Sequence, residues 1–135
     1  MHIASTSTGT SDVTLWEQHS GEVVRKLAGH TGLVNCLLVV PHEKLTLLAT
    51  GSRDKTIRMW DVKTGNVLLV LHGHEGQVKC LALLPDGRLV SGGGSSLLVG
   101  GELKVWANTP VGSDSAADGG EPAEPAANGD AQDAA

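Results

Sequence analysis

Three side chains of the types used in nucleophilic catalysis occur in the middle of the chain: His30, Thr50 and Asp54. A hydroxyl activated by an imidazole, which a carboxylate orients in turn, is the arrangement of a catalytic triad. A triad also needs a hydroxyl that the substrate can reach and an oxyanion hole beside it. These residues therefore raise the hypothesis of a hydrolase, which depends on whether Thr50 is accessible.

The six histidines suggest a second kind of site, for a metal ion, most clearly at His72-Gly73-His74. Alternate residues of a strand point to one face, so two imidazoles could bind one ion. No cluster of Cys, Asp or Glu supplies a third and fourth ligand, and we expect no metal. The glycines at 92–94 resemble a phosphate-binding loop, but neither a Lys-Ser/Thr pair nor a helix start follows them. We therefore expect no cofactor and interpret this run as a flexible hairpin.

The segments that carry these residues recur with a fixed spacing. The best copy, GHTGLVNCLLVVPHEKLTLLATGSRDKTIRMWD, is framed by a Gly-His pair and a Trp-Asp pair. Gly73 lies 44 positions after Gly29 and opens a second copy, and Trp16 lies 44 positions before Trp60. A period in the forties with these markers is typical of four-stranded propeller blades and not of helical repeats.

On these motifs the chain resembles the WD-repeat (beta-transducin repeat) family from Asp12 to Trp106, most strongly at GSRDKTIRMWD. The resemblance implies an all-β fold, an incomplete β-propeller of four-stranded antiparallel blades with about two and a half repeats. We expect a flexible N-terminus at 1–11, a partial blade at 12–29, a complete repeat at 30–73, a third repeat with a lengthened hairpin loop at 74–106, and a disordered acidic tail at 107–135.

Apolar patterning predicts strands within each copy. The run Leu33–Val40 predicts an innermost strand covered on both faces, and Thr46–Thr50 predicts the next strand. After a polar hairpin, residues Thr56–Trp60 alternate as in a half-buried strand. In the third copy the lengthened loop has an apolar tip at residues 97–99. The prediction for the chain is two strands in the first copy, four in the second and three in the third.

Composition argues against several classes of function. The net charge of -5 comes from six acidic residues after Trp106, whereas the repeats carry ten basic and nine acidic residues. A nearly neutral repeat region gives no electrostatic basis for binding nucleic acid or an anionic membrane. There is no apolar run of about 18 residues and no signal-like N-terminus, so we expect an intracellular protein, cytoplasmic or nuclear. Cys36 and Cys80 occupy one repeat position, and we expect buried free thiols there.

In the WD-repeat family, the positions held here by His30, Thr50, Asp54 and Trp60 form a hydrogen-bonded chain through each blade. The resemblance implies that the indole donates to the hydroxyl, that the hydroxyl meets the imidazole, and that the carboxylate fixes the imidazole. A hydroxyl committed to a buried Trp cannot act as a nucleophile, so we expect no catalytic residue and no enzyme activity.

The flanking copies depart from this pattern. The third copy keeps His74, Ser91 and Trp106 but has Gly100 at the Asp position, counted back from the Trp. The first copy has Thr10 there, with Asp12 close by. We expect both networks to be incomplete and the middle blade to be the most rigid.

The resemblance also implies a docking surface, on the face that carries the Gly-His loops and the polar hairpins. The implied partner-binding residues are Leu33, Asn35 and Arg53 in the middle repeat, and Gln77 and Lys79 in the next. Arg53 is the strongest candidate, because a planar guanidinium on a rigid turn suits a carboxylate or phosphate of a partner. A solvated charge without a specific role is the alternative for Arg53.

The expected function is that of a non-catalytic scaffold or adaptor that binds other proteins or peptides. The alternative is the substrate-recognition subunit of an enzyme complex, such as a ubiquitin ligase. Because a propeller closes with about four to eight blades, we expect Leu37, Val39, Leu81 and Leu83 to line the exposed faces of an open arc. The chain is then part of a larger propeller, or it completes a ring with another WD-repeat chain or with itself.

Overall fold

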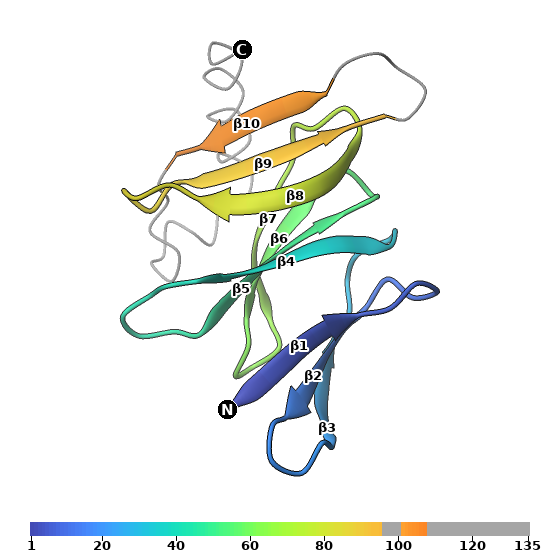
Figure 1. Cartoon of the computed structure of the whole chain (residues 1–135), viewed down its shortest axis with the longest axis vertical. Coiled ribbons are helices and arrows are strands. Elements are labelled where there is room, and N and C mark those ends of the chain that lie inside the picture. The colour runs from blue at the N-terminus through green and yellow to red at the C-terminus, as the bar shows by residue number, and fades with distance from the viewer. Residues whose placement is uncertain (96–100, 108–135) are drawn as a thin grey trace.

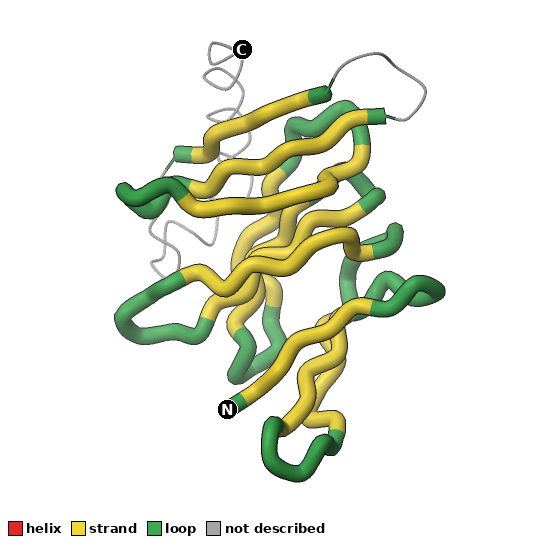
Figure 2. The backbone as a smooth tube through the Cα atoms, in the orientation of Figure 1, coloured by secondary structure: helices red, strands yellow, loops and turns green. Residues whose placement is uncertain are grey.

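The structure, a computed structural model, describes residues 1–95 and 101–107. All regular elements in these ranges are β-strands, joined by loops and turns (Figure 2). Ten strands form three antiparallel sheets, arranged side by side as an open arc (Figure 1). Within the described ranges there is no helix of the length and apolarity needed to cross a membrane. The predicted all-β, open propeller architecture is confirmed.

The first sheet has the order β1-β2-β3, with strands at His2–Thr6, Val13–Glu17 and Val23–Leu27. The prediction of a flexible N-terminus at 1–11 is wrong for residues 2–6, which pair with β2 and set Ser5 opposite Thr14. The sequence offered little apolar content here, but the backbone ladder and the packing of Ala4 against a buried cluster hold the strand. The described residues therefore form ten strands and not nine.

The middle sheet has four strands in sequence order: β4 Val34–Val40, β5 Leu47–Ser52, β6 Ile57–Asp61 and β7 Val67–Leu71. Every residue of β5 is buried, because β4 and β6 flank it and the other two sheets pack on its faces. The prediction that the innermost strand is covered on both faces is wrong: β4 is an edge strand, and Asn35 and Val39 are exposed.

The third sheet has the order β8-β9-β10, with strands at Gln77–Leu83, Leu89–Gly94 and Glu102–Trp106. Its register is close to that of the middle sheet, since Leu81 faces Ser91 as Leu37 faces Thr50. The predicted apolar loop tip at 97–99 lies outside the described residues. The same holds for the predicted acidic tail, apart from Ala107.

Apolar side chains fill both interfaces between sheets. One cluster joins the first and middle sheets around Leu15, Leu48 and Trp60, and the other joins the middle and third sheets around Met59 and Trp106. Each of these tryptophans packs toward the sheet that precedes its own. Of the four residues expected to line exposed faces, only Val39 is exposed, at 68%, whereas the partly buried Leu37, Leu81 and Leu83 pack against the two clusters.

The two cysteines are free, but their environments differ. Cys36 is half-buried, and burial raises the pKa of its thiol to about 11. Cys80 is exposed, so the prediction of burial is wrong for this residue. The equivalent strands β4 and β8 differ here because Cys36 packs against the cluster between the middle and third sheets, whereas Cys80 belongs to neither buried cluster of the described residues.

Candidate functional site

A continuous chain of hydrogen bonds crosses the middle sheet. The Trp60 indole N–H donates to Thr50 Oγ1 at 2.9 Å, and Thr50 Oγ1 lies 2.7 Å from His30 Nε2. The opposite ring nitrogen, His30 Nδ1, lies 2.8 Å from Asp54 Oδ2. With the proton on Nδ1, every donor in this series meets an acceptor. The network links β5, β6 and the loop that precedes β4.

Burial and charge keep this arrangement in one protonation state. Burial lowers the pKa of His30, so the imidazole is neutral at pH 7. Burial opposes ionisation of Asp54, but hydrogen bonds from Thr56, His30 and the Thr31 amide lower its pKa to about 2. The carboxylate therefore stays charged and holds the Nδ1–H tautomer of the imidazole.

The triad hypothesis fails on accessibility. Thr50 is 0% exposed and the His30 side chain is likewise enclosed. The hydroxyl accepts from Trp60 and faces His30 Nε2, so neither a substrate carbonyl nor an oxyanion can approach it. The network can fix the geometry of the sheet but cannot attack a substrate.

Steric crowding explains why glycine precedes the histidine in each Gly-His pair. A Cβ on Gly29 would lie 3.1 Å from the Trp60 ring and from the Arg58 guanidinium. Gly73, the equivalent residue, has a φ of 140°, which side chains rarely adopt, and its Cβ would lie 3.5 Å from the Trp106 ring. These glycines let the chain pass close to the indoles that the histidines then face.

The third sheet repeats the network up to its last link. Trp106 Nε1 donates to Ser91 Oγ at 2.8 Å, and that oxygen lies 2.6 Å from His74 Nε2. The Nδ1 atom of His74 has no hydrogen-bond partner among the described residues, and the nearest carboxylate oxygen, on Glu102, is 3.6 Å away. Glu102 instead accepts hydrogen bonds from the amides of Glu75 and Gly76.

Sequence reasoning missed Glu102. Counting six residues back from the Trp gave Gly100, but Glu102 lies four residues before Trp106, where the middle repeat has Thr56. Its longer side chain reaches the amide after the histidine, as Asp54 reaches the Thr31 amide. An acidic residue at the start of the strand that carries the Trp was the available signal.

Sequence reasoning also missed Ser5 in the first sheet. Trp16 Nε1 donates to Ser5 Oγ at 2.8 Å, so Ser5 holds the position of Thr50 and Ser91. Neither Thr10 nor Asp12 takes part in this contact. The spacing of eleven residues between Ser5 and Trp16, close to the ten between Thr50 and Trp60, was the signal.

The buried network supports the polar hairpin between β5 and β6. Ser52 Oγ donates to the Gly32 carbonyl at 2.9 Å and accepts from the Asp54 amide at 3.0 Å. The Arg53 amide donates to the Leu33 carbonyl at 2.8 Å. These contacts tie the hairpin to the loop before β4. The backbone that carries Arg53 is therefore held from two sides, while its side chain is exposed.

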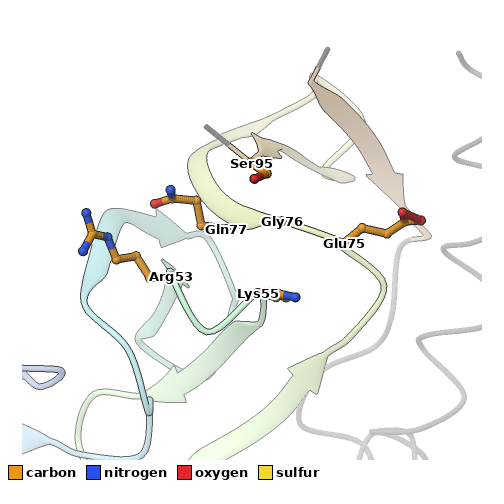
Figure 3. Close-up of a pocket in the computed structure, with 6 residues that line it drawn as sticks. All are labelled: Arg53, Lys55, Glu75, Gly76, Gln77 and Ser95. Carbon is orange, nitrogen blue, oxygen red and sulfur yellow. The ribbon is translucent and has the colours of Figure 1, made fainter. Parts of the chain in front are cut away.

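A polar pocket of about 380 Å³ lies between this hairpin and the third sheet. Figure 3 shows Arg53 and Lys55 on the hairpin and Glu75, Gly76 and Gln77 on the segment that leads into β8. Ser95, which follows β9, completes the lining. Lys55 has a φ of 75°, in the left-handed region where glycine or asparagine is usual. The pocket thus brings together residues more than 40 positions apart in the sequence.

Comparison with known proteins identifies this architecture. Residues 21–61 and 65–106 match the family model described as WD domain, G-beta repeat (WD40), and together they make up more than half of the chain. The chain belongs to the WD40 repeat family. Each matched repeat begins with the last strand of one sheet, β3 or β7, and continues through three strands of the next. A WD40 repeat in sequence therefore joins two neighbouring sheets covalently.

A solved structure supports the same assignment for this WD40 chain. This chain is similar to the crystal structure of the WD40 beta propeller domain of Doa1, with 29% sequence identity and a TM-score of 0.66. The similarity covers 79% of this chain and 33% of the Doa1 chain, so this chain spans about a third of the length of that relative. No curated protein sequence matches the chain.

The predicted partner-binding residues of the WD40 chain do not all meet at the pocket. Arg53 and Gln77 line it, whereas Lys79 is exposed outside its lining. The Asn35 amide donates to Gln77 Oε1 at 3.1 Å and to the Val78 carbonyl at 2.8 Å, so it connects β4 to β8. Leu33 is half-buried, and its carbonyl holds the hairpin. Lys55 and Glu75 are lining residues that the sequence did not single out.

Ligands for a metal ion do not converge in the part of the chain that the structure describes. No group of three or more His, Cys, Asp or Glu side chains there has the arrangement of a metal site. His74 is buried in the network with Ser91, whereas His72 is exposed. The two histidines are therefore in different environments, and both lie outside the described strands, between β7 and β8.

Proposed function

We propose that this WD40 chain is a non-catalytic interaction module, an adaptor or scaffold, whose polar pocket binds an acidic segment of a partner protein. WD40 propellers commonly mediate protein interactions. The observation that carries the proposal is the pair of cations on the hairpin between β5 and β6. Arg53 and Lys55 are both exposed at the pocket, and neither forms an ion pair with another described residue.

The geometry of the hairpin favours recognition over simple solvation. Arg53 projects from backbone that the Leu33 carbonyl and the Ser52 hydroxyl hold in place, so binding orders its side chain but little backbone. A guanidinium can make two parallel hydrogen bonds to one carboxylate. Lys55 occupies a left-handed conformation at a cost of about 1 kcal/mol, which a partner contact would offset.

The remaining lining residues suggest the form of the partner. Glu75 lies across the pocket from the hairpin and adds one negative charge, and Gln77 supplies an amide. A peptide with an Asp or Glu followed or preceded by a basic residue would match both signs of charge. Asn35 fixes the position of Gln77 through its hydrogen bond, so the amide is oriented before a partner binds.

Affinity capture with the full chain, followed by mass spectrometry, tests this proposal. We expect Arg53→Ala and Lys55→Asn each to lower partner recovery about three- to thirtyfold, and higher salt to lower it for the unmodified chain. Asn tolerates the left-handed conformation, so Lys55→Asn removes the charge without straining the turn. Lys63→Asn, at an exposed turn between β6 and β7, is the matched control and should keep full recovery.

Equal recovery with the Arg53, Lys55 and Lys63 variants would refute the proposal. Ligase subunits recovered with the same sensitivity to Arg53 would favour the substrate-recognition role over a simple scaffold.

A further inference from the structure

The loop that leads into β8 is held differently from the equivalent loop before β4. In the middle repeat, Ser52 Oγ donates to the Gly32 carbonyl at 2.9 Å. Gly93 holds the position of Ser52 in the third sheet and has no side chain to make such a bond. A Cβ on Gly93 would overlap the Gln77 carbonyl oxygen, so a serine does not fit there. The third repeat therefore needs another group to hold this loop.

Glu102, at the start of β10, supplies that group. Its Oε1 and Oε2 atoms both accept from the Glu75 amide at 2.9 Å, and Oε1 also accepts from the Gly76 amide at 2.9 Å. Hydrogen bonds from amides to a carboxylate are charge-assisted and stronger than those between neutral groups. The carboxylate thus fixes two consecutive residues, and both of them line the polar pocket.

Two further contacts restrain the same wall of the pocket (Figure 3). A Cβ on Gly76 would lie 2.5 Å from the Gly94 carbonyl carbon and 2.8 Å from the Ser95 amide nitrogen, so the loop packs directly on the end of β9. From the middle sheet, Asn35 Nδ2 donates to Gln77 Oε1 at 3.1 Å. Together with the bonds to the carboxylate, these contacts hold three successive residues of the wall.

This use of Glu102 leaves the buried network of the third sheet incomplete. In the middle repeat, Asp54 accepts both from the amide after the histidine and from the His30 imidazole. Glu102 accepts from the equivalent amide, but its Oε2 lies 3.6 Å from His74 Nδ1, which has no hydrogen-bond partner among the described residues. A buried polar group without a partner is destabilising, and natural proteins depart from full satisfaction chiefly at functional or strained sites.

We propose that Glu102 is a positioning residue of the polar pocket, whose carboxylate presets the wall that carries Glu75 and Gln77 for an acidic partner segment. In the described structure Glu102 is not one of the lining residues, so it acts through these two side chains and needs no contact with the partner. A wall that is ordered before binding loses less entropy when the partner arrives. This inference rests on the proposed function, because it concerns the same pocket.

Hydrogen exchange of the full chain without a ligand, followed by NMR, tests the positioning itself. Glu102→Gln replaces the charged acceptor by a neutral amide with one acceptor oxygen, so the Glu75 and Gly76 amides should exchange about three- to thirtyfold faster. Leu103→Gln is the matched control, because Leu103 is the next residue of β10 and is 59% exposed. It should leave both rates unchanged. Unchanged rates in Glu102→Gln would overturn the proposal.

Binding of a fluorescein-labelled peptide, a Glu-Lys pair between glycines, measures the consequence for the pocket. Glu102→Gln should bind it about three- to tenfold more weakly than the unmodified chain, the effect of ordering one or two side chains on binding. Leu103→Gln should bind it as the unmodified chain does. Trp fluorescence confirms that each variant is folded under the conditions of the titration.

A double-mutant cycle separates positioning from a general loss of stability. In an Arg53→Ala background, Glu102→Gln should still weaken binding by its full factor, because the hairpin is held independently of β10. In a Glu75→Ala/Gln77→Ala background it should have no further effect, because the side chains that it positions are absent. A loss of the same size in both backgrounds would overturn the proposal.

Failure of the proposed function gives a different result. If the unmodified chain and Arg53→Ala bind the peptide equally, the pocket does not recognise an acidic segment, and the role of Glu102 in binding fails with the proposed function. If binding depends on Arg53 but Glu102→Gln binds as tightly as the unmodified chain, the proposed function stands and the positioning role alone is wrong.

Discussion

The Nδ1 atom of His74 lies 3.6 Å from Glu102 Oε2, whereas the equivalent atom of His30 lies 2.8 Å from Asp54 Oδ2. Only the shorter separation is a hydrogen bond. The buried His74 nitrogen therefore has no hydrogen-bond partner in the described part of the chain, while Asp54 accepts from an imidazole, a hydroxyl and two amides. Two repeats with the same His, hydroxyl and Trp thus differ in the completeness of their networks. This difference has consequences for stability.

We expect Asp54→Ala to lower the free energy of unfolding by about 1–3 kcal/mol, because it leaves the buried His30 Nδ1–H without an acceptor. Glu102→Ala should cost only about 1 kcal/mol, since Glu102 bonds the exposed Glu75 amide and the part-buried Gly76 amide and makes no hydrogen bond to the buried imidazole. Asp12→Ala, which removes no hydrogen bond of the first sheet's Ser5–Trp16 pair, should change stability by less than about 0.5 kcal/mol. Urea unfolding followed by Trp fluorescence measures all three, and equal losses would contradict this ranking.

Stability should fall as the pH is lowered through the range where histidine titrates. Burial lowers the pKa of His30 and His74 in the folded protein, so the unfolded chain binds protons more readily. Their contribution is fully present above the ordinary histidine pKa of about 6.5 and is lost as the pH falls below it. The slope is at most about 1.4 kcal/mol per pH unit for each histidine. A second loss follows at lower pH, from about 4 down to about 2, as Asp54 takes up its proton.

Unfolding midpoints in urea between about pH 7.5 and 5 would test the histidine contribution. A midpoint that stays constant over this range would contradict it. The Asp54→Ala variant should keep the histidine-dependent loss and show a smaller loss at lower pH, where Glu102, whose pKa is also lowered, still titrates.

Gly51→Ala should destabilise the protein by about 1–3 kcal/mol through overpacking between sheets. A Cβ at Gly51 would lie 2.5 Å from Val78 Cγ1 and 2.7 Å from Cys36 Sγ, and Val78 is fully buried. Gly92 holds the same repeat position, but its Cβ would come too close to one described atom alone, the thiol sulfur of exposed Cys80, at 2.8 Å, and would make an ordinary contact of 3.9 Å with the Glu102 carbonyl. Gly92→Ala should therefore cost less than Gly51→Ala in the same unfolding assay. A larger loss at Gly92 would show that the inter-sheet contact at Val78 is not tightly packed.

A chain that ends at Ala107 should keep its unfolding midpoint and its partner binding. The residues after it are rich in Gly, Ala, Pro and acidic side chains, a composition that does not support a packed core. Urea unfolding and affinity capture of the truncated and full chains make the comparison. A shifted midpoint or a lost partner would assign these residues a role beyond solubility.

The sequence by itself determined the all-β class, the repeats and the middle network. A 44-residue period with Gly-His and Trp-Asp markers is local information, and His30, Thr50, Asp54 and Trp60 lie at standard positions within one repeat. Arg53 was also identifiable, because its hairpin belongs to the same repeat. Only the tertiary structure decided which residues act at places where the pattern breaks. Glu102 and Ser5 take part in their networks because the fold brings them close to their partners. One follows a lengthened loop and the other lies on a polar N-terminal strand, and neither segment carries a clear periodic pattern.

The polar pocket also depended on tertiary structure, because it lies between sheets. Lys55 and Glu75 became candidates only when neighbouring repeats were placed side by side. Burial also depended on the packing of the sheets. The apolar run of β4 predicts a strand covered on both faces, yet Val39 is exposed, because no described strand pairs with the other edge of β1 in the adjoining sheet. Hydrophobic pattern specifies which residues can be buried, and the packing of one sheet on the next decides which of them are.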